Sequence, residues 1–280
     1  MCQFCVQHGE GKRWYLQAQN YAADLTSDLA RRGYMLDFIR DFDRHRAQAI
    51  AGLELLNTMP RPIREPIKRK VRRGFLDQHF GQPVPLEECE HIFDFATEIV
   101  RMPCVCRRFA GTAQGDGWCM AVTTRPVDDL LLEGFGSYED GPDAADFQHL
   151  TKAEAMRMLR DAEEQGLMHS VWTFMTPFIA AICNCNLSSG CMAMRITREL
   201  DTKIMWKGEW VASVDRQACT GCRRCEKRCP FGAVLWDRAS KRAEVDASAC
   251  WGCGVCRSAC EKEAIGLAER SAVPLVANDW

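Results

Sequence analysis

The sequence predicts an α+β protein, in which a mainly helical N-terminal domain precedes a small domain of helices and β-hairpins. Apolar residues recur at helical spacing over much of the first 165 residues. Near the C-terminus, strand-like runs at residues 233–237 and 243–246 flank a polar turn, and the cysteine spacing C-x2-C-x2-C-x3-C occurs twice over residues 219–260. We expect four regions: residues 1–102, 103–210 and 211–270, and a tail of residues 271–280.

The chain has 280 residues, enough for about two domains with a sizeable core. Its apolar and charged fractions, 47% and 26%, are ordinary for a soluble globular protein, and a net charge of −2 favours neither nucleic acid nor a membrane surface. The first residues form neither a basic nor an apolar leader, and the longest apolar run, residues 171–185, is too short to span a bilayer. We therefore expect no signal peptide, no membrane insertion and a cytoplasmic location.

The cysteines number 17, an odd count in a chain too long for a disulfide scaffold, which indicates metal-binding thiols in a reducing compartment. At the N-terminus, Cys2, Cys5 and His8 are spaced to reach one metal ion but supply only three ligands. The alternative is a pair of free thiols on a flexible chain end.

The spacing of Trp14, Tyr21 and Leu25 predicts a helix that ends near Gly33, followed by a second helix over residues 34–57. After a proline break comes the dense basic run of the chain, which consists of Arg61, Arg64, Lys68, Arg69, Lys70, Arg72 and Arg73. Such a run is usually a solvated helix face. The alternatives are docking of an acidic redox partner and, least favoured, contact with a nucleic-acid backbone.

A third helix is expected over residues 86–101, ended by Pro103, and residues 128–148 are expected to form an acidic surface loop. Thr151 and Glu154 form a capping box that predicts a helix to about Gln165. Gly166 ends this helix, and a strand is expected over residues 167–172. Helix, glycine and strand in this order resemble the recognition end of a winged-helix unit.

Nine cysteines lie outside the doubled motif, and four of them form C-x-C pairs, at residues 104–106 and 183–185. Packing alone has no use for two neighbouring thiols in an irregular segment, so we expect a further iron–sulfur or zinc site. Its expected ligands are Cys104, Cys106, Cys183 and Cys185, with Cys119 and Cys191 as substitutes.

Three other residues near these pairs are open to a structural interpretation. Cys89 is expected to be a small buried apolar residue. We expect His169 to be packed or hydrogen-bonded rather than a ligand. Arg107 is expected either to donate a hydrogen bond to a cluster sulfur or to form a surface ion pair.

In the doubled motif, three thiolates of each run can hold three corners of a cubane cluster, and the fourth cysteine reaches across to the other cluster. Zinc is the alternative, because paired C-x2-C motifs also bind it, although four thiolates suffice for a zinc ribbon. The echo of residues 231–234 in residues 262–265 indicates a duplicated unit about a pseudo-twofold axis. The expected ligand sets for two [4Fe-4S] clusters are Cys219, Cys222, Cys225 and Cys260 for one, and Cys250, Cys253, Cys256 and Cys229 for the other.

Residues 219–230 and 250–260 resemble the signature of bacterial-type ferredoxins with two [4Fe-4S] clusters. Pro230 follows Cys229 as in that family, whereas Glu261 follows Cys260, where the family usually has a second proline. The resemblance implies a small ferredoxin-like fold that performs one-electron transfer. Clusters held only by thiolates favour low potentials.

The middle of the chain resembles a second group, ferredoxin-like proteins of anaerobes whose function is poorly defined. The shared features are C-x-C-R at residues 104–107, a glycine-rich segment with Cys119, a G-L-x-H turn at residues 166–169 and I-C-N-C at residues 182–185. In those relatives further cysteines often follow I-C-N-C directly, whereas here the next thiol is Cys191. The resemblance implies a shared architecture rather than a particular reaction.

We therefore expect low-potential electron transfer by iron–sulfur clusters, as an electron carrier or as the electron-input subunit of a partner redox enzyme. The sequence has no dinucleotide-binding fingerprint, P-loop or nucleophile elbow. One alternative is an oxidoreductase whose N-terminal metal centre binds a substrate. A second alternative is a redox-responsive DNA-binding regulator that uses the winged-helix-like segment and the basic run.

Overall fold

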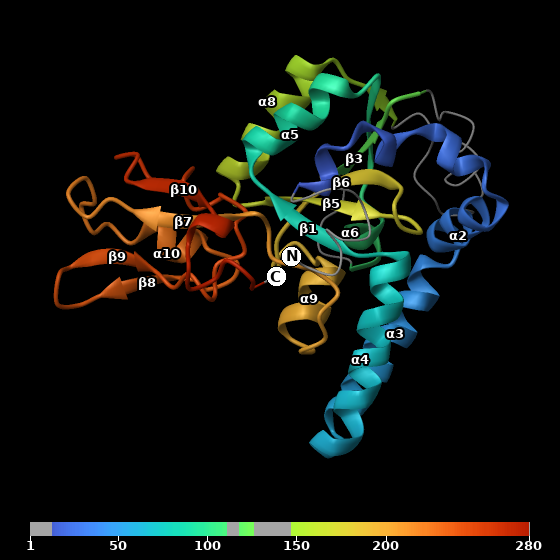
Figure 1. Cartoon of the computed structure of the whole chain (residues 1–280), viewed down its shortest axis with the longest axis horizontal. Coiled ribbons are helices and arrows are strands. Elements are labelled where there is room, and N and C mark those ends of the chain that lie inside the picture. Colours follow the sequence, from blue (N-terminus) through green and yellow to red (C-terminus); the bar gives the residue numbers. More distant parts are fainter. Residues whose placement is uncertain (1–12, 111–117, 126–146, 280) are drawn as a thin grey trace.

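The structure is a computed structural model that describes residues 13–110, 118–125 and 147–279 (Figure 1). Cys2, Cys5, His8 and most of the loop expected over residues 128–148 lie outside these residues. The described part combines helices with antiparallel sheets, which confirms the α+β class.

A six-stranded sheet forms the centre of the molecule, and every pair of neighbouring strands in it is antiparallel. Its strands come from both sides of the boundary expected between residues 102 and 103. Their order is β1-β5-β6-β3-β2-β4, with β1 (Gly81–Val84), β2 (Glu98–Pro103), β3 (Trp118–Thr123), β4 (Gln148–His149), β5 (Met168–Thr173) and β6 (Ile179–Cys185).

The two faces of this sheet have different roles because side chains alternate along each strand. On one face, Met120, Val122 and Ile182 are buried in a core shared with helices α5 (Leu86–Phe95) and α8 (Lys152–Glu164). Figure 1 shows these two helices together above the sheet. The other face carries the thiols of β3 and β6 and is described below.

Helix α8 confirms the predicted capping box. The Thr151 hydroxyl accepts from the Glu154 backbone N–H, and the Glu154 carboxylate accepts from the Thr151 backbone N–H at 2.8 Å. Gly166, with φ +85°, then leads into β5 as expected. β5 lies inside the sheet, between β1 and β6, so this helix–glycine–strand unit is part of the larger sheet.

The N-terminal helix is not continuous, contrary to the prediction. Its residues form three short 3-10 helices, η1 (Trp14–Leu16), η2 (Ala18–Tyr21) and η3 (Ala23–Ser27). The buried Trp14, Tyr15 and Tyr21 hold this segment against the core, and the Tyr21 hydroxyl donates to the Tyr15 carbonyl at 2.7 Å. Burial of three aromatic rings from one short segment therefore outweighs the helical spacing.

The next two helices also differ from their predicted limits. Asp28 caps α2 (Leu29–Arg40) by accepting from the N–H groups of Ala30 and Arg31, so this helix passes through Gly33 instead of starting after it. A glycine inside a helix costs about 1 kcal/mol relative to alanine. After a break at Asp41, α3 (Phe42–Asn57) begins, so the helix expected over residues 34–57 is two helices.

The helix expected over residues 86–101 is also shorter than predicted, because α5 ends at Phe95. The following residues form β2, which pairs with β3 from Glu98 to Pro103. The helical spacing continues across this boundary, but the pairing supplies backbone partners that a continued helix would forgo. Pro103 consequently ends a strand rather than a helix.

The basic run lies on α4 (Arg61–Gln78), which extends away from the sheet in Figure 1. Part of the run holds the fold together. Lys68 is buried and its Nζ donates to the carbonyls of Leu200 and Asp201 at 3.2 and 2.7 Å, and Arg72 lies over the Trp206 ring. The exposed remainder consists of Arg61, Arg69, Lys70 and Arg73.

The C-terminal unit contains two small antiparallel sheets, in which β7 pairs with β10 and β8 pairs with β9. It packs against the N-terminal half through the Trp210 indole, which donates to Glu88 Oε1 at 2.9 Å, and through an ion pair of Glu87 with Arg257. Its elements are β7 (Trp210–Val214), α10 (Arg224–Arg228), β8 (Val234–Asp237), β9 (Arg242–Val245), β10 (Ile265–Glu269) and η5 (Arg270–Ala272).

Arg270 ties the segment that links the two halves to the C-terminal unit. It is completely buried, and its guanidinium donates to the carbonyls of Gly208, Trp210 and Cys250 at 2.7, 3.0 and 2.8 Å. A buried carbonyl that loses its donor costs free energy because it cannot hydrogen-bond to water.

We expect Arg270→Met to lower the free energy of unfolding by about 3 kcal/mol, because three buried carbonyls lose their donor. Urea unfolding under anaerobic conditions measures the change. The exposed Arg238→Met, in the turn after β8, is the matched control and should change stability by less than about 0.5 kcal/mol. Equal effects of the two substitutions would contradict a structural role of Arg270.

Glu163 lies at the end of α8, where the C-terminal unit covers it. Burial raises its pKa to about 7, more than the nearby Arg257 lowers it. An acid with a higher pKa in the folded than in the unfolded state binds more protons when folded. Its stabilising contribution is therefore complete below about pH 4, the unfolded pKa, and is lost as the pH rises through 7.

Glu163→Gln should therefore be more stable than the parent protein at alkaline pH. We expect its advantage in the free energy of unfolding to grow by about 2 kcal/mol between pH 5.5 and pH 8.5. Urea unfolding at the two pH values provides the measurement, with the exposed Glu164→Gln on the same helix as control. An advantage that is constant with pH would contradict the raised pKa.

Candidate metal centres

The doubled cysteine motif repeats its backbone conformation, as the sequence predicts. Gly221 and Gly252, each just before the second cysteine of its run, both have φ +74°. The residues that follow the second cysteine, Arg223 and Gly254, also have positive φ, and so do the equivalent Gly232 and Glu263. The two halves are therefore a structural duplication.

Hydrogen bonds repeat in the same way. The backbone N–H of Ala233 lies 3.3 Å from Cys229 Sγ, and the N–H of Ala264 lies 3.3 Å from Cys260 Sγ. A third donor, the N–H of Ala212, lies 3.4 Å from Cys250 Sγ. Such bonds to sulfur stabilise thiolates and help to set the reduction potential of an iron–sulfur cluster.

The fourth cysteine of each run acts electrostatically on thiols of the opposite run. Burial raises the pKa of Cys225, and the neighbouring thiols of Cys222 and Cys260 contribute to the increase.

The second set behaves alike: burial raises the pKa of Cys253 well above its ordinary value, and the thiols of Cys256, Cys250 and Cys229 act in the same direction. These neighbours belong to the expected interleaved sets, although Cys225 of the other set also raises the pKa of Cys256. The donor set thus fits cluster ligation by thiolates.

Glu261, which stands where the signature described above usually has proline, forms an ion pair with Arg224 of α10. This contact joins the end of the second run to the helix of the first run. The backbone conformation of the neighbouring Glu263 still matches that of Gly232. The missing proline therefore leaves the repeat of the two halves intact.

A second set of thiols lies on the face of the central sheet opposite α5 and α8. Because side chains alternate along a strand, Cys183 and Cys185 of β6 point to the same face, with Asn184 between them pointing to the other. In the register of the sheet Cys119 of β3 is directly opposite Cys183, and their sulfur atoms are 3.7 Å apart. Strand pairing therefore brings together cysteines that are 64 residues apart in the sequence.

Cys104 and Cys106 join this set at the start of α6 (Val105–Ala110), directly after β2. The buried guanidinium of Arg107 donates to the Asn184 carbonyl and so ties α6 to β6. Arg107 thus joins α6 to β6 from within the fold and has no ion-pair partner among the described residues. Hydrogen bonds from Cys106 and Cys119, and the Arg107 backbone N–H and charge, hold the pKa of Cys104 well below its ordinary value.

Cys191 completes the set just before α9 (Met192–Arg198). A hydrogen bond from Cys185 and the backbone N–H groups of Met194 and Ala193 lower the pKa of Cys191. The same hydrogen bond, together with burial, raises the pKa of Cys185. Thiolates are the metal-binding form of cysteine. We call the six residues Cys104, Cys106, Cys119, Cys183, Cys185 and Cys191 the thiol group.

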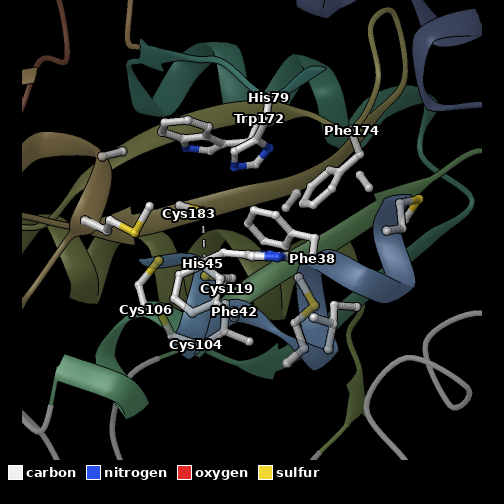
Figure 2. Close-up of a pocket in the computed structure, with 18 of the residues that line it drawn as sticks. Phe38, Phe42, His45, His79, Cys104, Cys106, Cys119, Trp172, Phe174 and Cys183 are labelled. Carbon is white, nitrogen blue, oxygen red and sulfur yellow. Dashed lines mark hydrogen bonds between the residues drawn. The ribbon is translucent and has the colours of Figure 1, made fainter. Parts of the chain in front are cut away.

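All six members of the thiol group line one cavity of about 420 Å³. Figure 2 shows Cys104, Cys106, Cys119 and Cys183 at one side of it, facing aromatic rings. The substitute ligands of the prediction, Cys119 and Cys191, therefore lie at the same place as the two C-x-C pairs. Within the described residues, no group of three or more His, Cys, Asp or Glu side chains has the arrangement needed to hold one metal ion.

The sequence did not indicate the residues opposite the thiols. Phe38, Phe42, His79, Trp172 and Phe174, which we call the aromatic wall, come from α2, α3, β5 and adjoining segments and line the same cavity (Figure 2). Only Phe38 and Phe42 follow a helical spacing, and that pattern equally describes a core. Their convergence requires the tertiary structure.

The remaining predictions concern Cys89 and His169. Cys89 lies on the inner side of α5 and is fully buried in the core. His169 is also fully buried, its Nδ1 lies 2.6 Å from Asn184 Oδ1, and burial lowers its pKa to about 4. It points to the face of β5 away from the cavity, in agreement with a hydrogen-bonding role.

The comparisons with known proteins agree with the C-terminal geometry. The family model of the 4Fe-4S dicluster domain matches residues 218–265. This segment therefore has the characteristics of a 4Fe-4S domain, which supports iron–sulfur electron transfer. No curated protein matches the chain. In the part of the chain that the structure describes, no helix is long and apolar enough to cross a membrane.

The tight turn at Gly252, just before the second cysteine of its run, predicts that a side chain there will cause a loss of iron. A Cβ at Gly252 would overlap the Trp210 carbonyl oxygen, whereas a Cβ at Gly232, with a similar φ of +69°, would meet its nearest atom at 4.0 Å. We therefore expect Gly252→Ala to lose about four irons per chain, the content of one cubane cluster, and Gly232→Ala to lose none. Iron and acid-labile sulfide analysis after anaerobic purification measures this, and equal iron in both variants would contradict the proposed turn constraint.

Proposed function

We propose that this protein performs low-potential electron transfer through two [4Fe-4S] clusters in residues 211–270 and a further metal–sulfur centre held by the thiol group. The expected ligands of the clusters are the two interleaved sets of the doubled motif. Electrons would enter from, or leave to, a partner redox protein. The proposal gains support from the 4Fe-4S family match and from the proximity of each fourth cysteine to the opposite run.

The observation that best supports an internal electron path is a buried core to which both sets of cysteines contribute. Cys185 and Cys191 of the thiol group belong to the same apolar cluster as Cys253, and Cys183 and Cys229 pack against it. Phe231, two residues after Cys229, and Trp251, next to Cys250, stack in this core with ring centroids 4.8 Å apart.

A partner protein could dock on the exposed basic residues of α4, which are Arg61, Arg69, Lys70 and Arg73. Lys68 is excluded from this role because it is buried and donates to the carbonyl of Asp201. Basic residues of this kind would attract an acidic surface and increase the rate of association at low ionic strength.

A second candidate function is an oxidoreductase, and the cavity of about 420 Å³ favours it. Ligand pockets usually have volumes of about 300–1,000 Å³ and mostly apolar walls. Here the thiol group forms part of the wall, so a metal–sulfur centre would face the bound molecule. The doubled motif would then supply the electrons.

Metal analysis of the parent protein and of Cys104→Ala/Cys183→Ala tests the proposal. Two cubane clusters contain about eight irons. We expect about twelve irons per chain in anaerobically purified parent protein and about eight in the double variant, with clusters that low-potential donors reduce reversibly.

Cys89→Ala is the matched control, because Cys89 lies in the core outside the cavity, and it should keep the full iron content. Eight irons without zinc in both parent and double variant would leave two clusters and no further centre. Clusters that are never reduced reversibly would overturn electron transfer itself. Zinc lost by the double variant would indicate a structural site instead.

A further inference from the structure

The aromatic wall of the cavity has a construction that metal binding alone does not require. His79 lies at its centre, with ring centroids 4.6 Å from Phe38, 4.9 Å from Phe174 and 5.0 Å from Trp172. Phe38 in turn lies 5.3 Å from Phe42. Rings in mutual contact form a preformed surface, and aromatic faces bind flat conjugated molecules by offset or edge-to-face stacking.

The charge of the cavity limits what can occupy it. Among the described residues that line it, none is Lys, Arg or Glu, and Asp37, its one carboxylate, is exposed to solvent. An anionic ligand would lose hydration there without gaining an opposite charge, because no described lining residue is Lys or Arg. The lining therefore favours an uncharged molecule over an anionic one.

His79 supplies a directional polar group. Its Nδ1 lies 2.6 Å from the Thr173 carbonyl oxygen, and a carbonyl can only accept, so Nδ1 carries the hydrogen. Burial lowers the pKa of His79 to about 4, so the ring is neutral at pH 7 and Nε2 has a free lone pair. The contact through Nδ1 leaves Nε2 able to accept a hydrogen bond.

We propose that the cavity binds an uncharged, flat, ring-containing molecule with a hydroxyl or N–H group, which stacks on the aromatic wall and donates a hydrogen bond to His79 Nε2. The thiol group then lies across the cavity from the bound ring. The proposed ligand class would be that of the substrate in the second candidate function. Binding does not depend on the proposed electron transfer, whereas reduction of the bound molecule rests on it.

Equilibrium dialysis of the anaerobically purified full chain against three probes tests the inference. The probes share one bicyclic ring: 2-naphthol has a donor, naphthalene has none, and naphthalene-2-sulfonate has a charge. We expect saturable binding of one 2-naphthol per chain. Naphthalene should bind about three- to tenfold more weakly, which corresponds to one hydrogen bond. The sulfonate should bind weakest.

Two substitutions on α3 separate the cavity from the surface. Ala49 lines the cavity, and Ala47 is exposed two residues earlier on the same helix. We expect Ala49→Phe to lower 2-naphthol affinity at least tenfold because the new ring fills the cavity, and Ala47→Phe to change it less than twofold. Far-UV circular dichroism and cluster absorbance verify that both variants fold.

His79→Phe tests the hydrogen bond, because it keeps an aromatic ring and removes Nε2. Its affinity for 2-naphthol should fall to that of naphthalene, while naphthalene binding stays within twofold. An equal loss for both probes would show that His79 acts through packing alone and would overturn the donor requirement.

Other outcomes distinguish this inference from the proposed function. Absent 2-naphthol binding, or equal binding by the Ala49→Phe and Ala47→Phe variants, would overturn the ligand site. Equal binding of the sulfonate would overturn the requirement for a neutral ligand. Iron content and reversible cluster reduction, measured in the same samples, report on electron transfer independently, so either idea can fail while the other stands.

Discussion

The antiparallel pairing of β3 with β6 is the constraint on which both the core and the thiol group depend. This register places Cys119 opposite Cys183 and Met120 opposite Ile182. The alternation of side chains sends the two thiols to one face and the two apolar residues into the core beneath α5 and α8. A slip of one residue would move the thiols into that core, so the burial of apolar side chains also fixes the geometry of the thiol group.

The two halves of the chain join through a common core rather than a free linker. Apolar residues of β5, α9 and the C-terminal unit form one cluster, in which cysteines of both sets take part. Exclusion of water there raises the pKa of Cys253 well above its ordinary value, which disfavours a thiolate until a metal compensates for the lost hydration.

Three buried cations join separate segments of the chain through backbone carbonyls. Arg107, Arg270 and Lys68 donate to the carbonyls of Asn184, Cys250 and Leu200, respectively. A buried carbonyl and a buried cation are each costly alone, and together they satisfy one another. In this way the fold holds cysteine-bearing segments in place without using the cysteines themselves.

The sequence by itself determined the features whose interactions are local. The two cysteine runs, their duplication, the capping box at Thr151 and the burial of Cys89 follow from spacing and residue type, because the interacting groups lie a few residues apart or depend on one residue's character. It indicated the C-x-C pairs as a site and offered Cys119 and Cys191 only as substitute ligands, since their contacts depend on strand register and on the position of α9.

Only the tertiary structure decided the remainder. The helical spacing at residues 14–29 gave way to the burial of Trp14, Tyr15 and Tyr21, and residues 98–101 became a strand because β3 offers them backbone partners. The aromatic wall gathers residues from segments more than 130 positions apart, with no shared motif. Hydrophobic packing and strand pairing act between surfaces that meet only after folding, so no local pattern in the chain records them.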